Sequence, residues 1–396
     1  MSADASSSGS TFAAPDAPDT PDTPATPDAP DASSVPAVSG ASPAPVSPSS
    51  ASATAARRAP PPLWSDVEIE TVTLLKAALP AHRALAACAE ALIRTPLDAA
   101  ALEAFSLLDA VGAVQLDGEP VDPHAALEAP APLREATVVR QMTALGRARE
   151  LGAPVGSTLA LELAALIVGR DVSVRRGPAD PGDGGRCPPP LPQGAERLQG
   201  RLERWQDFVQ RDSGDLDPLL LCGIALAEWL AIRPFTGGNV RVGQLLVQLM
   251  MVEEELLPAP LLPLSLHASR RSDACWQALH ASRLAGHPAA WLRFFLGAIE
   301  ASARDTSARL AHWEAYCATL PGTLESLLPK RPSAGLLQLC ARPSFGLADA
   351  IDTGLARRQT AAAWLTRLVE GGLLRERRAG KEKRYVNDAV VSLLLD

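Results

Sequence analysis

Apolar side chains recur every three or four residues over most of the chain after residue 62, which is the period of helices with one buried face. The most apolar stretches, 217–232 and 240–254, are expected at the centre of the core. One short alternating stretch, 170–176, predicts a strand before a surface loop rich in glycine and proline. The expected helices span 67–92 (as one helix or two), 96–111, 133–151, 158–168, 194–211, 217–232, 240–254, 276–284 and 289–304.

The two ends of the chain differ from this helical middle. Residues 1–62 consist mainly of Ala, Pro, Ser, Thr and Asp, and they are expected to be disordered because they offer almost no large apolar side chain. Residues 330–396 carry twelve Lys and Arg against seven Asp and Glu. Their order of helices (333–339, 345–353 and 358–370), a Gly-Gly pair and a hairpin with a basic turn is the layout of a winged helix.

Composition narrows the class of protein. The chain has 396 residues, a formal charge of −8 and only 4% aromatic residues, which disfavours a β-sandwich or barrel. Its six cysteines form no CxxC pair, so neither a zinc site nor a disulfide framework is expected. The N-terminus lacks a signal peptide, and Glu228 interrupts the longest apolar stretch, so we expect a cytoplasmic protein without a membrane span.

A loop at residues 233–239 (RPFTGGN) opens the helix expected at 240–254. A glycine-rich loop before a helix directs several backbone N–H groups to one spot, and the helix dipole makes that spot attractive to anions. Arg233 and Arg241 flank it. The alternative is that the glycines only turn the chain between two buried helices.

This loop resembles the motif of the Fic (Fido) family, His-Pro-Phe-x-Asp/Glu-Gly-Asn-Gly-Arg-x-x-Arg. Residues 233–244 read RPFTGGNVRVGQ, in which Pro234, Phe235, Gly238, Asn239 and Arg241 agree with it. The segment 109–122 resembles the family's inhibitory helix, with Asp117-Gly118 in place of its Glu-Gly and Ala113 in place of its Ser. Residues 264–266 and 291–296 resemble the family's helices after the motif.

The resemblance implies an all-α Fido fold, with a helical core and a short β-hairpin flap, followed by a C-terminal winged helix-turn-helix. The domains expected from it are a disordered tail (1–62), an N-terminal helical segment (63–130), a Fido core (131–310), a linker helix (311–329) and a winged-helix domain (330–396).

The activity that the resemblance implies is transfer of a nucleoside monophosphate, commonly AMP from ATP, to a hydroxyl of a target protein. In the family the motif His is the general base and the Asp/Glu holds Mg²⁺. Here Arg233 cannot accept a proton near neutrality, and Gly237 offers no carboxylate, so we expect no Mg²⁺ at the motif. Val240 replaces a glycine and is expected to obstruct the phosphates, while Gln244 removes an Arg.

The inhibitory segment departs in parallel. The family's Glu bridges to the last motif Arg, whereas here the shorter Asp117 would face the neutral Gln244. We therefore expect no ion pair to hold this segment and its Gly118 in place. None of the six histidines falls in the motif, and His267, after 264–266, which we expect to form a strand-like turn, is the one most worth locating.

These departures favour a catalytically impaired module that binds a nucleotide or another anion, or acts in regulation. ATP is the candidate ligand, and the expected contacts are Arg233, Gly238, Asn239, Arg241 and Gln244. Two alternatives stay open at the motif. Arg233 could be a structural donor to nearby carbonyls, or the chain could be an active adenylyltransferase with an unorthodox motif that modifies a protein target still to be identified.

The basic C-terminal segment suggests DNA as a further partner and a transcriptional regulator as a third function. Cations at the start of the helix at 358–370 and on the wing would contact phosphates or bases. The alternative is a charged face that mediates protein contacts. The candidate residues are Arg357, Arg358, Gln359, Lys381, Lys383 and Arg384.

Overall fold

The computed structural model describes residues 63–64, 67–129, 134–151, 154–176, 187, 195–210, 216–328, 333–352, 357–379 and 382–395. Within these ranges no helix is both long and apolar enough to cross a bilayer. The described elements, in chain order, are α1 (Val72–Arg94), α2 (Ala99–Leu116), α3 (Pro123–Glu128), α4 (Ala136–Leu151), α5 (Ser157–Val168), α6 (Ala195–Gln210), α7 (Pro218–Ile232), α8 (Asn239–Glu253), α9 (Leu264–Arg270), α10 (Ser272–Ala285), α11 (Ala289–Leu327), α12 (Ala334–Cys340), β1 (Ser344–Gly346), α13 (Leu347–Asp352), α14 (Arg358–Glu370), β2 (Arg375–Ala379), β3 (Glu382–Val386) and α15 (Asp388–Leu395).

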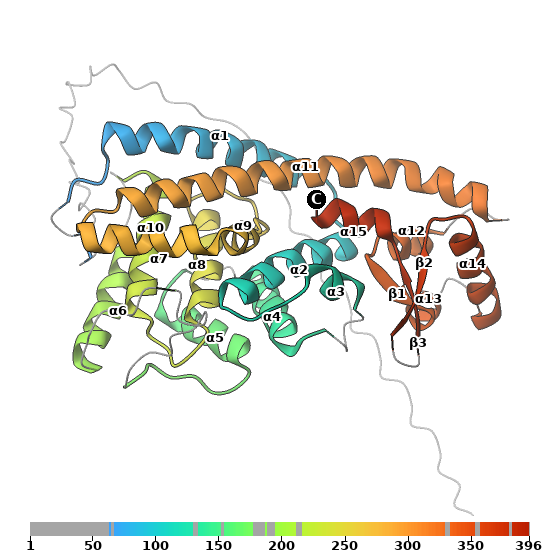
Figure 1. The fold of residues 1–396 in the computed structure, drawn as a ribbon, viewed down its shortest axis with the longest axis horizontal. Coiled ribbons are helices and arrows are strands. Elements are labelled where there is room, and N and C mark those ends of the chain that lie inside the picture. Colours follow the sequence, from blue (N-terminus) through green and yellow to red (C-terminus); the bar gives the residue numbers. More distant parts are fainter. Residues whose placement is uncertain are drawn as a thin grey trace, which may run out of the picture. The chain divides into compact units, whose positions relative to one another are not determined.

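Helices α7 and α8 lie in the main core, as their apolar sequences predict (Figure 1). Every residue of α7 after Pro218 is buried, because a helix that is apolar all round has no face to leave in water. Asp217 caps its N-terminus by accepting hydrogen bonds from the backbone N–H groups of Leu219 and Leu220. These two helices place the loop between them, residues 233–238, at one end of the core.

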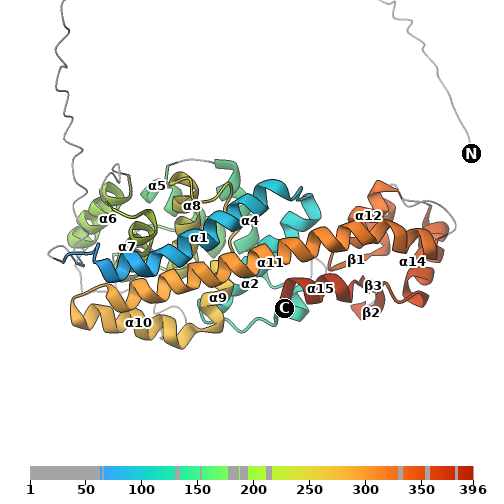
Figure 2. The same cartoon turned by 90° about the horizontal axis from the view of Figure 1, so that it is seen from above.

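Helices α1 and α11 run side by side (Figures 1 and 2). The buried side of α1 has apolar residues spaced alternately by four and three, the pattern of a coiled-coil seam, at Leu74, Ala78, Ala81, Leu85, Cys88 and Leu92. Helix α11 is a single helix of 39 residues. The sequence pattern predicts two helices here, at 289–304 and 311–329, but buried Thr306, Arg309 and Leu310 continue the same helical face between them.

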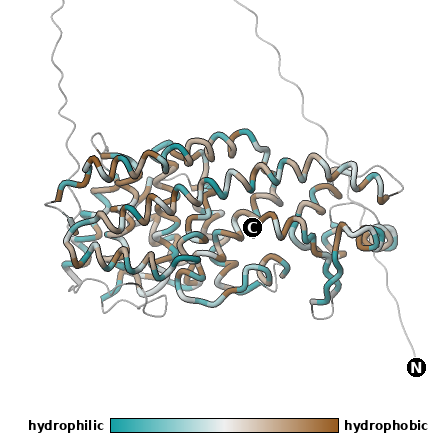
Figure 3. Tube along the Cα trace, turned by 45° about the horizontal axis from the view of Figure 1, so that its top comes forward, coloured by the Kyte–Doolittle hydropathy of each residue, from teal (hydrophilic) through white to brown (hydrophobic). Residues whose placement is uncertain are grey.

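The C-terminal elements form a three-stranded antiparallel sheet with the order β1-β3-β2 and helices around it. Strand β1 was missed: the sequence analysis expected a helix from residue 345, but Phe345 pairs with Tyr385 of β3, and their rings are 6.0 Å apart. The β2–β3 hairpin is mostly hydrophilic (Figure 3), apart from the buried Tyr385 and Val386 at the end of β3. A winged-helix assignment for this order of elements stays a prediction.

Two more expectations differ from the structure. Residues 264–266, expected as a strand-like turn, begin helix α9. The strand expected at 170–176 is reduced to one isolated bridge between Val174 and Phe235, and no β-hairpin flap is seen in the described part of the core. The loop that would complete such a flap lies largely outside the described residues.

Gly112 lets α2 lie directly on the backbone of α9. A Cβ at residue 112 would overlap the backbone N and Cα of Leu266, which cannot move as a flexible side chain could. We expect Gly112→Ala to lower the free energy of unfolding by about 1–3 kcal/mol. Gly297→Ala in α11 is the control, because nothing lies within 4 Å of its added methyl. It should raise stability by about 0.5–1 kcal/mol, and equal effects in urea unfolding would contradict the close approach.

Candidate functional site

The loop between α7 and α8 is held by its own residues. Arg233 ends α7 in the left-handed region, with φ 42°, a conformation that is costly for a residue with a side chain. The side chain of Asn239 accepts a hydrogen bond from the Phe235 N–H and donates one to the Phe235 carbonyl, each at 2.9 Å. Trp229 Nε1 donates to the carbonyl of Asn239 at 2.8 Å. Asn239 therefore uses its side-chain oxygen and nitrogen to close the loop.

The guanidinium of Arg233 serves the end of its own helix. The residue is 1% exposed, and its Nε donates to the carbonyl of Leu230 at 3.3 Å. Arg175 completes this end: its Nε and Nη2 donate to the carbonyls of Arg233 and Ile232, at 2.7 and 3.0 Å. Cations at a helix C-terminus satisfy the last carbonyls and interact favourably with the dipole. In this geometry Arg233 is a donor to a nearby carbonyl, as one of the two alternatives for this residue predicts.

Arg175 and Arg283 add to the positive charge around Arg233, and sequence reasoning missed both. Burial lowers the pKa of Arg175, and the charge of Arg233 lowers it further. Burial also lowers the pKa of Arg283, with Arg233 and Arg201 acting in the same direction and Cys187 and Glu228 opposing them. Arg175 lies in the basic stretch before the loop, but no local signal marks Arg283, which the tertiary fold brings from α10.

Gly238, which agrees with the motif, and Gly237 and Val240, which depart from it, have different surroundings. Gly238 adopts φ 72° directly before α8, with Ile167 and Val168 of α5 against it, so the turn still requires glycine. A Cβ at Gly237 would lie 3.9 Å from Val168, so a side chain fits there, although the chain has none. Val240 was expected to obstruct bound phosphates, but it is 2% exposed and packs into the core.

Asp117 forms an ion pair that the sequence analysis did not expect. Arg241 Nε donates to its Oδ2 at 2.7 Å, and both side chains are nine-tenths buried or nearly so. The expectation that no ion pair holds this segment is wrong, because Asp117 pairs with the first arginine of the motif and not with residue 244. Gly118, at φ 91°, turns the chain directly after it. Arg241 Nη1 and Gln244 Oε1 have no hydrogen-bond partner among the described residues.

A second polar contact joins α2 to α8 two turns away. Gln248 Nε2 donates to Asp109 Oδ2 at 2.9 Å, and both residues are buried. Burial raises the pKa of Asp109 to about 6, against the opposing effects of Gln248, Ser265 and Arg149. Helix α2 is therefore fastened to the motif helix at two points, Asp117–Arg241 and Asp109–Gln248, with Ala113 between them.

The donor set at the motif does not fit a resident Mg²⁺. Mg²⁺ prefers carboxylate oxygens, and residue 237 supplies none. The described residues contain no group of three or more His, Cys, Asp or Glu that could hold a metal ion. His267 lies on α9, where burial lowers its pKa, and the charges of Arg271 and Arg270 act in the same direction. Because residue 233 is an arginine, the motif itself supplies no histidine as a general base.

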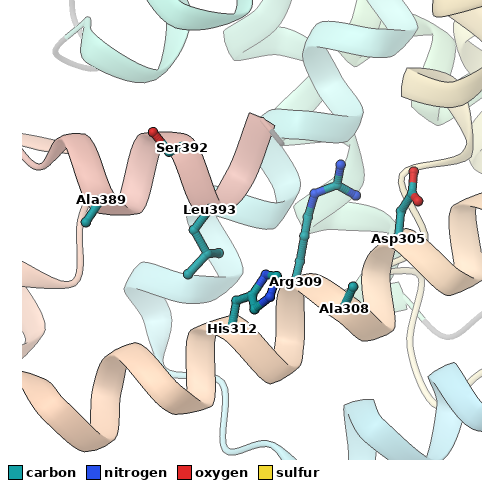
Figure 4. Close-up of a pocket in the computed structure, with 7 residues that line it drawn as sticks. All are labelled: Asp305, Ala308, Arg309, His312, Ala389, Ser392 and Leu393. Carbon is teal, nitrogen blue, oxygen red and sulfur yellow. The ribbon is translucent and has the colours of Figure 1, made fainter.

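A cavity of about 410 Å³ lies elsewhere, between α11 and α15. Figure 4 shows Asp305, Arg309 and His312 along α11, with Leu393 reaching toward them from α15. Arg309 Nε donates to the carbonyl of Leu394 at 3.0 Å, so its guanidinium caps the end of α15. None of the motif residues lines this cavity.

The C-terminal candidates for DNA contact divide into two groups. Arg357, Arg358 and Gln359 are exposed at the start of α14. Lys383 pairs with Glu376 at 2.9 Å, and Arg384 is 8% exposed and pairs with Asp349. Lys381 lies outside the described residues.

Carboxylates also meet two further cations of the hairpin. Arg375 and Arg377 both pair with Glu128 of α3. Much of the positive charge of β2 and β3 is therefore used within the chain, and DNA binding stays a prediction that rests on the cations of α14.

A family model matches the C-terminal elements. Residues 339–390, from the end of α12 into α15, match the family model SoFic-like_C, described as the C-terminal domain of SoFic-like protein adenylyltransferase. The match spans β1, β2, β3 and the helices between them.

Solved structures show weaker likeness. A Fic family protein from Desulfovibrio desulfuricans G20 is 15% identical, with a TM-score of 0.46, over 80% of this chain and 96% of that one. Fic-1 (aa134–508) from C. elegans is 18% identical, with a TM-score of 0.45, over 59% and 72%.

Proposed function

We propose that this chain, a Fic-family protein, is a binding or regulatory module that has lost adenylyl transfer and has kept a cationic site for a nucleotide or another anion. The observation that carries the proposal is the state of Arg233, which is buried and donates to a carbonyl of its own helix at the position of the general base. A guanidinium stays protonated in proteins, so it cannot activate a hydroxyl.

Loss of the general base affects activation of the hydroxyl, whereas loss of the metal carboxylate affects charge neutralisation on the phosphoryl group. General-base catalysis typically contributes about 100- to 10,000-fold to a rate. A bound metal ion neutralises charge on a transferring phosphoryl group, and the glycine at residue 237 gives it no side-chain ligand. Both changes lie in the loop at residues 233–238, at two different positions, so a single substitution would not restore the reaction.

The binding part of the proposal rests on Arg241 and the start of α8. Arg241 is 6% exposed, and its Nη1 has no hydrogen-bond partner among the described residues. A buried donor left without a partner is costly, and a phosphate oxygen would supply the missing acceptor. Asp117 already neutralises Arg241, so an anion has to compete with this carboxylate. We therefore propose that α2 controls access to the site.

The first test is nucleotide transfer. Incubation of the full chain with labelled ATP and Mg²⁺ is expected to leave no more label on the protein than on its Arg241→Ala variant. Incorporation above that level, lost when Arg233 alone is changed to Ala, would show an active enzyme with an unorthodox motif and would end the proposal.

The second test is binding, measured by calorimetry with ATP and ADP, with and without Mg²⁺. Asp117→Asn keeps the shape of the side chain but removes its charge, so Arg241 becomes available to the ligand. We expect about tenfold or greater tightening, because a hydrogen bond to a charged group contributes about 1.5–3 kcal/mol. Affinity should not depend on Mg²⁺. The control is Asp122→Asn, an exposed aspartate at the start of α3, which should bind as the parent does. Equal affinities of the parent and Asp117→Asn would contradict the competition.

A further inference from the structure

Helix α1 has a second apolar face, which points away from α11. Val72, Leu79 and Ile93 are 68%, 53% and 74% exposed, and the exposed Ala86 lies between the last two. These four residues are seven apart, which places them on one side of the helix every two turns. Leu75, 38% exposed, lies beside them. We call these five residues the outer stripe.

The outer stripe runs most of the length of α1. Figure 1 shows α1 at the edge of the described helices, above α11, so the stripe lies on the side that no described helix covers. Single exposed apolar residues are common, but an ordered row of large ones along a helix is typical of an interaction surface. A heptad row favours another helix as its partner.

The spacing of the outer stripe makes it complementary to itself. In an antiparallel pair of α1 helices related by a two-fold axis, the arrangement that brings Val72 of one copy near Ile93 of the other also brings Leu79 near Ala86. A large side chain then lies opposite a small one, which lets two helices approach closely. Such an isologous interface uses the same surface on both copies.

Charges beside the stripe fit the same arrangement. Lys76 and Glu90 are exposed and follow the spacing of the stripe on one flank. They are fourteen residues apart, about 21 Å along the helix, so they cannot pair within one chain. The two-fold arrangement places Lys76 of each copy near Glu90 of the other. Arg83 lies closest to the axis, where its long side chain can extend into water.

We propose that the outer stripe of α1 is a homodimer interface, in which a second copy of this chain packs its own α1 antiparallel to the first. The contact is independent of the motif between α7 and α8, so it stands or falls separately from the function proposed above.

Sedimentation equilibrium of the full chain tests the proposal. We expect a concentration-dependent dimer, which Leu79→Glu abolishes by placing a charge in the centre of the stripe. Leu284→Glu is the matched control, because Leu284 of α10 is 76% exposed and lies outside the stripe. It should leave the dimer constant unchanged. A monomeric parent protein would overturn the proposal. The outer stripe would then have to be covered by another protein or by residues 1–62.

A charge exchange separates this arrangement from other dimers. Lys76→Glu should weaken the dimer by about tenfold, because two attractive pairs become repulsive. The double variant Lys76→Glu with Glu90→Lys should recover the parent affinity, since both pairs re-form with reversed sign. Both changes are at exposed positions, so the fold is preserved. A dimer insensitive to Leu79→Glu, or one that the second exchange does not restore, would also overturn the proposal.

Discussion

Replacement of Arg201 by Met is expected to lower the free energy of unfolding by about 3–5 kcal/mol, measured by urea denaturation at neutral pH. Arg201 of α6 donates to Glu228 Oε1 from Nε and Nη2, at 3.2 and 2.5 Å. The Glu228 side chain is fully buried in α7, and burial raises its pKa. Without Arg201 this carboxylate is left in the core without its pairing cation, which costs far more than the loss of a surface contact.

Two further variants identify the cause. Arg304→Met removes the cation of an exposed pair with Glu300 on α11 and should cost less than about 1 kcal/mol. The double variant Arg201→Met with Glu228→Gln should recover much of the lost stability, because no charge is then buried. If Arg201→Met costs no more than Arg304→Met, the pair does not hold α6 to the core.

Replacement of Asp109 by Asn should change how stability depends on pH. The folded protein raises the pKa of Asp109 from 3.8 to about 6, mainly through burial, so the folded state binds this proton more tightly than the unfolded chain does. Stability from Asp109 is therefore greatest below pH 4 and is lost as the pH rises through 6. The full loss is about 3 kcal/mol, since one pKa unit corresponds to about 1.4 kcal/mol.

Asparagine carries no such penalty at high pH. Between about pH 5 and about pH 8 the Asn variant should gain about 1.5 kcal/mol relative to the parent, measured as the difference between their unfolding free energies. The comparison over pH removes any constant loss caused by the new amide. Asp171→Asn, at an exposed position, is the control and should show no such gain. A pH-independent difference for Asp109→Asn would contradict its buried charge.

Two aspartates, Asp109 and Asp117, hold the α2 segment to α8. Asp117 occupies the motif arginine, and Asp109 anchors the same helix two turns away. A ligand that displaces Asp117 also works against the Asp109–Gln248 contact if α2 moves as a rigid helix. Above pH 6 Asp109 is charged while buried. The free energy of the contact between α2 and α8 is therefore least favourable at neutral and higher pH.

Much of the helical core could be predicted from the chain. The periods of apolar residues located α4 to α8 within a few residues, because each has a buried face or is buried all round. The loop before α8 was found because its two glycines are consecutive and Arg233 and Arg241 flank them. Strand β1 was missed because three residues, Ser344–Gly346, are too few for a period, and only their pairing with β3 defines them.

Side-chain chemistry alone shows that residue 233 is a cation without proton-acceptor capacity and that residue 237 has no carboxylate. Which groups lie near Arg233 and Arg241 depends on the tertiary structure. Arg175, Arg283 and Asp117 come from segments about 50 to 125 residues away, and no local pattern specifies which of several cations a buried aspartate will neutralise. The packing of α2 on α8 sets that choice, because it fixes Asp117 opposite Arg241 and leaves Gln244 without it.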